Sequence, residues 1–450
     1  TIAAHLCDLS SGEVMASASL MNPQIRFGED LMSRVSYVMM HPEGAEELTV
    51  VIREALNSLF AEVAAAIDGA VEDILEITLV ANPIMHHILL GISPVELGGA
   101  PFALTTDAAV EVAAAELELN INPGGRIYIL PCIAGHVGAD TAGMILSEEP
   151  QEQDQMTLLV DVGTNAEIVL GNRQRLLACS SPTGPAFEGA QISCGQRAAT
   201  GAIERVRIDP QTLEPRFKVI GSDLWSDEAG FSAAIEGHGV TGICGSGIIE
   251  VVAEMYLAGI VTVDGIVDGD LVNRTERVIQ NDRTWSYVLH RSETDEAQVL
   301  VTQNDIRQIQ LAKAALYAGV KLLMDHIGTD RVERIRLAGA FGSHINVQHA
   351  MVLGLIPDCV LNEVSSAGNA AGTGARIALL NRQSRQVIET LVKNIEKIET
   401  ALEPKFQNYF VDAMAFPNKT DPFPNLFSLV SRPAVKAVAD MAGGRKRRRR

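Results

Sequence analysis

An apolar run that ends at Asp161 and turns at Gly163 constrains the fold more than any other part of the chain. Residues 158–170 form the pattern of a buried strand, an Asp-x-Gly-Thr turn and a second strand. Gly163 lets the backbone turn tightly and come close to a ligand, while Thr164 and Asn165 supply donors for phosphate oxygens. The pattern predicts a phosphate-binding turn at the end of a strand. An ordinary hairpin turn that contains Asp and Gly stays open as the alternative.

The order of elements around this turn occurs twice along the chain. A strand, a turn and a strand follow the Asp161 motif, and residues 1–20 show the same unit without a strand before it. Each half then has a strand ending in a small-residue loop, and each closes on a Gly-rich helix start. These segments are residues 77–82 and 135–142 in the first half, and residues 335–342 and 368–375 in the second. The order predicts two related lobes and a sequence that begins one strand late.

The composition excludes several functions. The 450 residues are 47% hydrophobic and 20% charged, which is typical of a globular protein of two or three domains. The formal charge is −20, and leaving out the six basic residues at positions 445–450 leaves 30 basic against 56 acidic residues, or −26. Such a body repels nucleic acid and anionic membranes. We expect the basic tail to be a solvated end, with docking on an acidic partner as the alternative.

Neither a membrane segment nor a redox centre is predicted. No apolar stretch is long enough to span a bilayer, and the first residues lack a basic segment followed by an apolar one, so we expect a cytoplasmic protein. The six cysteines are scattered without C-x-x-C or ferredoxin spacing, which predicts reduced, buried side chains. Any redox centre must then lie outside this chain. The neighbours His86 and His87 point to different faces of a helix and have no third ligand at suitable spacing.

Polar linkers and periodicity predict three parts. Residues 1–150 form the first lobe, with a helix near residues 48–66 and a polar linker at its end. Residues 151–381 form the second lobe, which contains a long helix from about 304 to 326. Residues 382–450 form a C-terminal helical extension, with a charged helix that reaches about Leu402, and the basic tail.

Four further segments are candidates for a nucleotide site. A loop at residues 181–189 carries Gly184 and Glu188 and can reach a ligand. The glycine-rich residues 242–247 precede a helix, whose free amides would favour an anion; a helix start packed against a strand is the alternative. Residues 339–342 end a strand and would let an adenosine lie on bare backbone, unless they form only a tight junction. Gly138 and Asp140 offer a carboxylate from the first lobe, although a helix cap explains Asp140 equally well.

At these residues the sequence resembles the actin, Hsp70 and sugar-kinase superfamily, and within it the reductive activators of corrinoid proteins. The closer resemblance is carried by residues 22–30, 181–195, 242–247 and 368–375 and covers nearly the whole chain. It implies an α/β fold of two duplicated actin-like, ribonuclease H-like lobes with a nucleotide cleft between them. It also implies that residues 161–165 are the second phosphate motif, 339–342 the adenosine motif and 138–140 a connecting segment.

The residues expected to act follow from this resemblance. Asp161 would act through Mg²⁺ or orient the attacking water, Glu188 is a candidate for activating that water, and Asp140 is the third candidate catalytic carboxylate. The residues expected to bind ATP are Gly138, Gly163, Thr164, Asn165, Gly184, Gly245, Ser246, Gly247, Gly339, Ala340, Gly342 and Gly372. The implied activity is ATP-dependent reduction of cobalt(II) to cobalt(I) in a corrinoid held on a partner protein. The resemblance also implies a homodimer.

The sequence departs from the family pattern at its start. Family members carry an N-terminal ferredoxin-like domain with an iron–sulfur cluster, and then an Asp-x-Gly-Thr-Thr turn ahead of the strand that begins here at Thr1. Neither is present, so we expect a 2Fe–2S electron donor outside this sequence and poor nucleotide binding by this chain alone. A small-molecule kinase that uses the same cleft is an alternative function. A nucleotide-gated scaffold or chaperone of the actin type is another.

Overall fold

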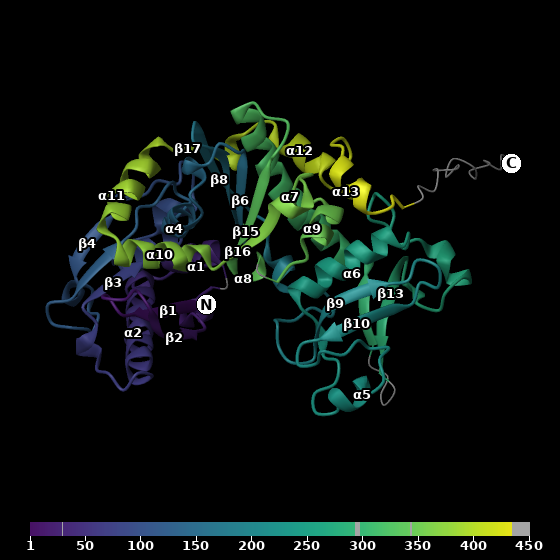
Figure 1. Cartoon of the computed structure of the whole chain (residues 1–450), viewed down its shortest axis with the longest axis horizontal. Helices are drawn as coiled ribbons and strands as arrows, with labels where there is room; N and C mark the ends of the chain where they lie inside the picture. The colour runs from purple at the N-terminus through teal and green to yellow at the C-terminus, as the bar shows by residue number, and fades with distance from the viewer. Residues whose placement is uncertain (29, 293–297, 343, 434–450) are drawn as a thin grey trace. The chain divides into compact units, whose positions relative to one another are not determined.

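The computed structural model describes residues 1–28, 30–292, 298–342 and 344–433 (Figure 1). The basic tail at 445–450, for which a solvated end was predicted, and Glu29, in the motif at residues 22–30, lie outside the described residues. The chain divides into two compact units. Unit 1 consists of Thr1–Ser181, Leu322–Ser343 and Val364–Glu403; unit 2 consists of Pro182–Lys321, His344–Glu363 and the residues from Pro404 onward.

A six-stranded sheet forms the centre of unit 1. The strand order is β16 (Val364–Gly368), β15 (Arg334–Ala338), β6 (Thr157–Val162), β7 (Ala166–Asn172), β8 (Arg175–Ser181) and β17 (Glu396–Lys397). β15 lies parallel to both β6 and β16, while β7 is antiparallel to β6 and β8. Apolar side chains of β6 are fully buried on both faces, as expected of a central strand. The predicted strand, turn and meander around Asp161 are therefore confirmed.

The first half of the sequence repeats this topology with one strand fewer. β1 (Ile2–Cys7) and β2 (Val14–Leu20) are antiparallel, as β7 and β8 are. β3 (Glu76–Leu79) is parallel to β5 (Arg126–Ile129), as β15 is to β16, and β4 (Val110–Ala113) completes a three-stranded sheet. In the second half β6 joins β7 to β15, but no described strand joins β1 to β3.

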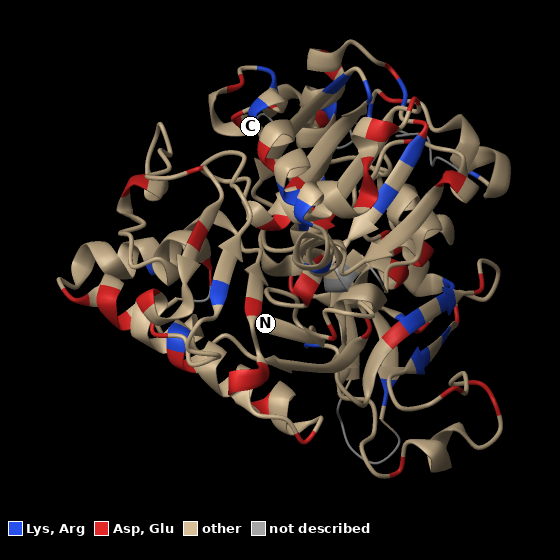
Figure 2. Ribbon diagram, turned by 60° about the vertical axis from the view of Figure 1, so that its left-hand side comes forward, with Lys and Arg blue, Asp and Glu red and all other residues tan. Residues whose placement is uncertain are grey.

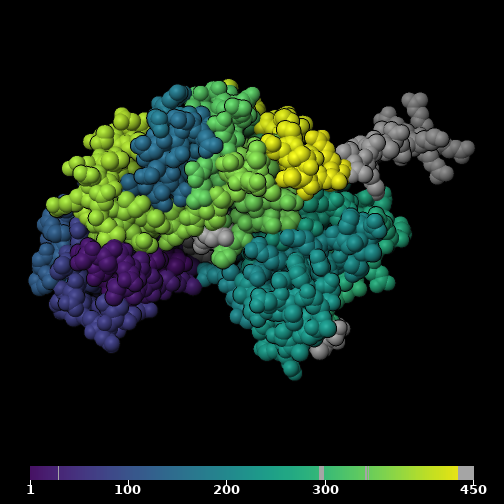
Figure 3. Space-filling view, viewed as in Figure 1, coloured from purple at the N-terminus to yellow at the C-terminus, as the bar shows by residue number. Residues whose placement is uncertain are grey.

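Helices cover these sheets. The helices of unit 1 are α1 (Leu31–Met40), α2 (Gly44–Ala65), α3 (Pro83–Leu89), α4 (Ala139–Glu148), α8 (Gly339–Gly342), α10 (Ala370–Leu380) and α11 (Arg382–Leu391). α2 buries Leu48, Ile52, Leu56 and Leu59 at helical spacing, which confirms the helix predicted there. Figure 3 shows the first strands, in purple, lying directly against the yellow-green segment that contains α10.

α4 and α10 cross at two glycines. A Cβ atom built on Gly374 would lie 1.9 Å from the carbonyl oxygen of Gly143, so the two backbones touch. α4 follows β5 in the first half, and α10 follows β16 in the second, so the crossing joins equivalent helices of the two halves. Residues from the first turns of both helices, Asp140 of α4 and Gly372 of α10, line one cavity.

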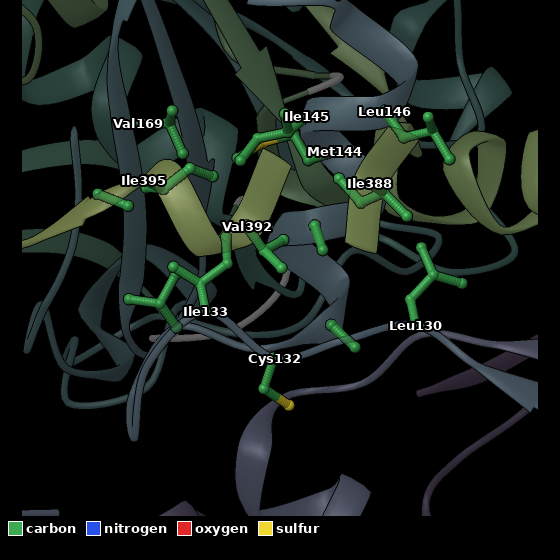
Figure 4. Packing of buried hydrophobic residues seen from close by; sticks show 14 of the residues in the cluster. Leu130, Cys132, Ile133, Met144, Ile145, Leu146, Val169, Ile388, Val392 and Ile395 are labelled. Atoms are coloured by element: carbon green, nitrogen blue, oxygen red, sulfur yellow. The ribbon is translucent and has the colours of Figure 1, made fainter. Parts of the chain in front are cut away.

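An apolar core holds these helices against the central sheet. Figure 4 shows Met144, Ile145 and Leu146 of α4 gathered with Val169 of β7 and Ile388 of α11. A second core lies under α2, around residues such as Leu48, Phe60 and Ile127. The second core uses residues of the first half only, whereas the first core draws on both halves of the sequence. Unit 1 therefore contains the whole of the first predicted lobe together with parts of the second.

Unit 2 is built on two three-stranded sheets. The first has the order β10 (Pro215–Val219), β9 (Ala202–Ile208), β11 (Gly242–Ile243), and the second β12 (Val278–Asn281), β13 (Thr284–Arg291), β14 (Gln298–Thr302). Its helices are α5 (Phe231–Ala234), α6 (Gly245–Leu257), α9 (Val347–Leu353), α12 (Phe406–Asp412) and α13 (Pro424–Leu429). The long helix α7 (Gln303–Ile327) begins in unit 2 and confirms the prediction for 304–326.

The charged helix predicted to run to about Leu402 is shorter than expected. α11 ends at Leu391, and a short 3₁₀ turn leads to β17, which pairs with β8. Ile395 and Ile398 on either side of β17 are buried, so pairing at the sheet edge overrides the helical pattern. No described helix combines the length and the apolar character needed to cross a membrane.

Candidate functional site

A cavity of about 730 Å³ opens in unit 1, where the ends of β6, α4 and α10 meet. Its lining includes the carboxylates of Asp140, Asp161 and Glu167, and Asn369 at the start of α10. The turn between β6 and β7, residues 163–165, also lines the cavity. The cavity therefore joins carboxylates to a turn rich in hydrogen-bond donors, which are the two features that a bound metal–nucleotide complex requires.

Asp161 stands at the end of β6, between two neighbouring strands. It is paired with Glu167 across the β6–β7 hairpin and with Ala338 on β15. The next residue, Gly339, has φ +81°, and a Cβ atom there would lie 2.3 Å from Asp161 Oδ1. Only glycine can both adopt this backbone conformation and leave room for the carboxylate. The predicted small-residue segment at 339–342 therefore packs directly against the Asp161 carboxylate.

The turn after Asp161 is tight. The amide of Gly163 donates to the carbonyl oxygen of Asn165 at 3.0 Å, so that three residues reverse the chain between β6 and β7. Gly163, Thr164 and Asn165 all line the cavity. A short turn that faces a cavity leaves little side-chain bulk between its backbone and a ligand.

Asp140 reaches the same cavity from the first turn of α4. Its Oδ1 accepts a hydrogen bond from the amide of Thr141 at 2.8 Å, and its own amide donates to Ala81 O at 3.2 Å. A Cβ atom on Gly138 would lie 2.6 Å from Ala81 O and 2.7 Å from Asp140 Oδ1. Glycine at position 138 therefore allows the start of α4 to pack against the end of β3.

α10 begins at the cavity in a similar way. The Asn369 side chain caps the helix by accepting from the amide of Gly372 at 2.9 Å. Asn369 and Gly372 both line the cavity. The partial positive charge of the α10 N-terminus therefore lies at the cavity, where it favours a phosphate group.

The carboxylates are held in an environment that opposes their charge. Burial, followed by the negative charge of Asp140, raises the pKa of Asp161 to about 6. Burial also raises the pKa of Asp140, although a hydrogen bond from the Thr141 amide acts in the opposite direction. The pKa of Glu167 is raised by burial and then by the charges of Asp140 and Asp161. A divalent cation would relieve this repulsion.

Mg²⁺ fits such a site only with help from a ligand. Within the described part of the chain, no three His, Cys, Asp or Glu side chains are close enough together to hold a metal ion by themselves. Mg²⁺ in proteins commonly binds one or two carboxylates and completes its shell with water and substrate phosphates. The donor set around Asp161 matches this second arrangement.

Several predicted site residues belong to the cavity and others do not. Asp140, Asp161, Gly163, Thr164, Asn165 and Gly372 line it. Gly138 and Gly339 lie against the carboxylates of Asp140 and Asp161. Gly342 is the last residue of α8, and a Cβ atom built on it would lie 2.9 Å from the backbone carbonyl carbon of Leu337. Ala340 lies in the same helix, and its side chain is outside the described part of the structure.

The remaining predicted residues lie in unit 2. Gly184 precedes a 3₁₀ turn, Pro185–Glu188, and Glu188, the last residue of this turn, is exposed. Gly245, Ser246 and Gly247 form the first turn of α6. A Cβ atom on Gly247 would lie 2.2 Å from Ile203 O, so close packing against β9 accounts for this glycine. The roles of these residues toward a nucleotide stay predictions.

The adjacent histidines of α3 are buried in unit 1. His87 Nδ1 contacts Pro83 O at 2.9 Å, and the amide of Thr105 donates to His87 Nε2 at 3.1 Å. Burial, and then the proximity of His87, lowers the pKa of His86 to about 4. Both rings are therefore neutral packing groups at physiological pH.

Glu167 was not among the residues predicted from the sequence. It stands in β7 among apolar residues and lines the cavity beside Asp161. The hydroxyl of Ser180 lies 3.4 Å from Glu167 Oε1. A carboxylate inside an apolar strand directly after the phosphate turn was the available signal.

Comparison with known proteins agrees with this architecture. Residues 155–427 match the family model described as the C-terminal domain of RACo, the ASKHA domain, and residues 1–153 match the model of the RACo middle region. The chain belongs to this family of reductive activators of corrinoid proteins. The matched domain is the actin-like domain that the sequence predicted, and the mixed α/β fold is confirmed.

Two named relatives are similar to this chain over most of its length. The corrinoid activation enzyme RamQ of Eubacterium limosum is 32% identical over 92% of this chain and 68% of its own length. The [Co(II) methylated amine-specific corrinoid protein] reductase of Methanosarcina barkeri is 23% identical over 65% of this chain and 52% of its own. A solved reductive activator for corrinoid, iron–sulfur protein superposes with a TM-score of 0.78 at 31% identity. It covers 92% of this chain, which spans 64% of the solved chain.

Proposed function

We propose that this chain is the ATP-binding part of an ATP-dependent activator that returns the cobalt(II) of a corrinoid protein to cobalt(I). The observation that carries the proposal is the cavity in which the Asp161 carboxylate and the β6–β7 turn meet Asp140. The names of the two curated relatives support the reductive part, since one is a corrinoid activation enzyme and the other a corrinoid protein reductase.

Asp161 is the proposed anchor for Mg²⁺. Bound Mg²⁺ would neutralise the charge that develops on the transferred phosphoryl group. Asp161 would hold it directly or through water, and the turn at residues 163–165 would orient the phosphates through its amide and hydroxyl donors. The raised pKa of Asp161, about 6, supports this role because a site that destabilises an isolated carboxylate favours a cation.

Glu167 and Asp140 are the proposed residues for orienting the attacking water. Both carboxylates face the cavity beside Asp161, and both have a raised pKa. A carboxylate with a raised pKa accepts a proton more readily at neutral pH, which suits a general base. Glu188, the candidate from the sequence, lies in unit 2 and stays an alternative.

Hydrolysis of ATP would supply the energy for an unfavourable electron transfer. Each 1.4 kcal/mol of coupled free energy corresponds to about 59 mV for one electron. A 2Fe–2S domain or protein outside this sequence would deliver the electron, and a corrinoid protein would receive it. A homodimer is the proposed assembly, from the family resemblance alone.

The opening between β1 and β3 supports one more part of the proposal. The cavity extends from the carboxylates along both strands, with α2 side chains such as Leu56 and Phe60 lining it. In the second half, β6 fills the equivalent position between β7 and β15. A strand from outside these 450 residues would complete the first sheet and carry a second phosphate turn to the carboxylates.

The test uses the full-length protein, a corrinoid protein in the cobalt(II) state and a low-potential electron donor. We expect the cobalt(I) absorption spectrum to form only when Mg²⁺ and ATP are present, and to be lost with Asp161→Asn. Asp154→Asn is the matched control, because Asp154 is an exposed carboxylate of the same unit, with 85% of its side chain accessible. Reduction without ATP, or a phosphorylated small molecule formed in stoichiometric amounts, would contradict the proposal.

A further inference from the structure

Four cationic side chains form a block on β9 and β10 in unit 2. The antiparallel register places Arg216 opposite Arg207 and Lys218 opposite Arg205. Figure 2 shows Lys and Arg segments, in blue, close together on neighbouring strands. Like charges placed directly opposite one another destabilise a strand pair. The block is also unexpected because the whole chain has a formal charge of −20.

One buried carboxylate neutralises only part of this charge. Glu250 of α6 is fully buried; its Oε1 lies 3.0 Å from Arg205 Nη1 and its Oε2 lies 2.6 Å from Arg207 Nη1. The two arginine side chains are still 35% and 37% exposed. Because one carboxylate serves two guanidinium groups, this half of the block keeps a net positive charge.

The other half has no carboxylate partner among the described residues. Lys218 Nζ donates to the carbonyl oxygen of Asp223 at 2.5 Å, and neither Lys218 nor the exposed Arg216 forms an ion pair within the described chain. A backbone carbonyl orients an ammonium group but does not cancel its charge. The outer half of the block is therefore not neutralised by an ion pair within the described residues, and Arg216 is exposed to the solvent.

Trp225 packs against three of these cations. The centre of its ring lies 4.8 Å from Arg216 Cζ, 5.5 Å from Lys218 Nζ and 6.0 Å from Arg207 Cζ. Contact with an aromatic face holds long basic side chains in place before a partner arrives, which lowers the entropy lost on binding. Tryptophan and arginine are also the residues most enriched where interfaces bind tightly.

We propose that Arg205, Arg207, Arg216, Lys218 and Trp225, here named the cationic face, dock an acidic surface of the corrinoid protein. This choice of partner depends on the proposed function. Opposite charges on two proteins accelerate their encounter and fix their orientation. Nucleic acid fits less well, since the block is short and the rest of a strongly acidic chain repels a polyphosphate.

The test compares two double charge reversals of equal size in the full-length protein. Arg216→Glu with Lys218→Glu changes the cationic face but spares the pairs of Glu250. Arg382→Glu with Lys393→Glu changes two exposed residues of unit 1. The partner is a corrinoid protein that raises the ATP turnover of the full-length protein. We expect the first variant to bind it at least about tenfold more weakly and with less dependence on salt, and the second to bind normally.

Two measurements separate the possible failures. ATP turnover without partner should be unchanged in both variants, because neither pair lies at the carboxylate cavity. Trp225 is one of two tryptophans, so its fluorescence in a Trp285→Phe background should change on binding. If both variants bind the corrinoid protein equally weakly, or if the first binds it normally, the docking role of the cationic face is refuted while the proposed function stands. The docking role is also refuted if the unchanged protein binds duplex DNA and the first variant does not. If no corrinoid protein raises turnover, the proposed function fails and this partner with it.

Discussion

Gly339→Ala tests whether the turn after β15 fixes the position of Asp161. The substitution has two effects that can be separated. At φ +81° an alanine is strained by roughly 1–2 kcal/mol. Its Cβ atom would also lie 2.3 Å from Asp161 Oδ1, so the carboxylate must move by about 1 Å to regain ordinary contact. A displacement of that size at a reacting centre can cost about 100-fold in rate.

Gly328→Ala is the matched control for this prediction. Gly328 follows α7 at φ +80°, and no described atom lies within 4 Å of the position of its Cβ. Both variants should lose similar stability in urea unfolding, whereas only Gly339→Ala should lose ATP turnover, by about 10–100-fold. Equal turnover in the two variants would refute the argument that Gly339 positions Asp161.

Three further predictions concern the same unit. The folded-state pKa of Asp161, about 6, exceeds its ordinary 3.8, so the folded protein without ligand binds more protons and loses roughly 3 kcal/mol as pH rises from about 4 through 6. Asp161→Asn should remove this loss, whereas Asp154→Asn should retain it; urea unfolding at about pH 4 and about pH 8 measures the loss in each protein. Glu167→Gln should lower the rate of ATP hydrolysis by about 100-fold or more while calorimetry still detects nucleotide binding; an unchanged rate would exclude Glu167 as the base. Gly374→Ala should destabilise the crossing of α4 and α10 by about 1–3 kcal/mol, whereas Gly237→Ala, in open space, should not; equal unfolding midpoints would contradict the close contact.

Local patterns in the sequence were sufficient for much of unit 1. The apolar run before Asp161 and the turn at Gly163 predicted β6 and its hairpin, because both depend on neighbouring residues only. The long periodicity of residues 304–326 predicted α7 for the same reason. At its start the Thr302 amide donates to Asp305 Oδ2 and the Asp305 amide donates to Thr302 Oγ1. The doubled order of elements is matched by the pairing of β1 with β2 and of β3 with β5, which repeat the pairings of β7 with β8 and of β15 with β16.

Features that depend on distant contacts were harder to predict. Glu167 could have been placed beside Asp161, since a hairpin that turns at residues 163–165 pairs these two positions. The early end of α11 could not, because it arises from the pairing of β17 with β8, more than two hundred residues earlier in the sequence. The close approach of Gly374 to Gly143 likewise follows from the packing of two halves and not from either local pattern.

The central claim is that ATP binds at the carboxylate cavity of unit 1. A crystal structure of the full-length protein with Mg²⁺ and a non-hydrolysable ATP analogue tests it most directly. We predict that the phosphate groups lie against the turn at residues 163–165, with the metal ion beside Asp161. A nucleotide bound elsewhere, with this cavity filled only by water, would contradict the account.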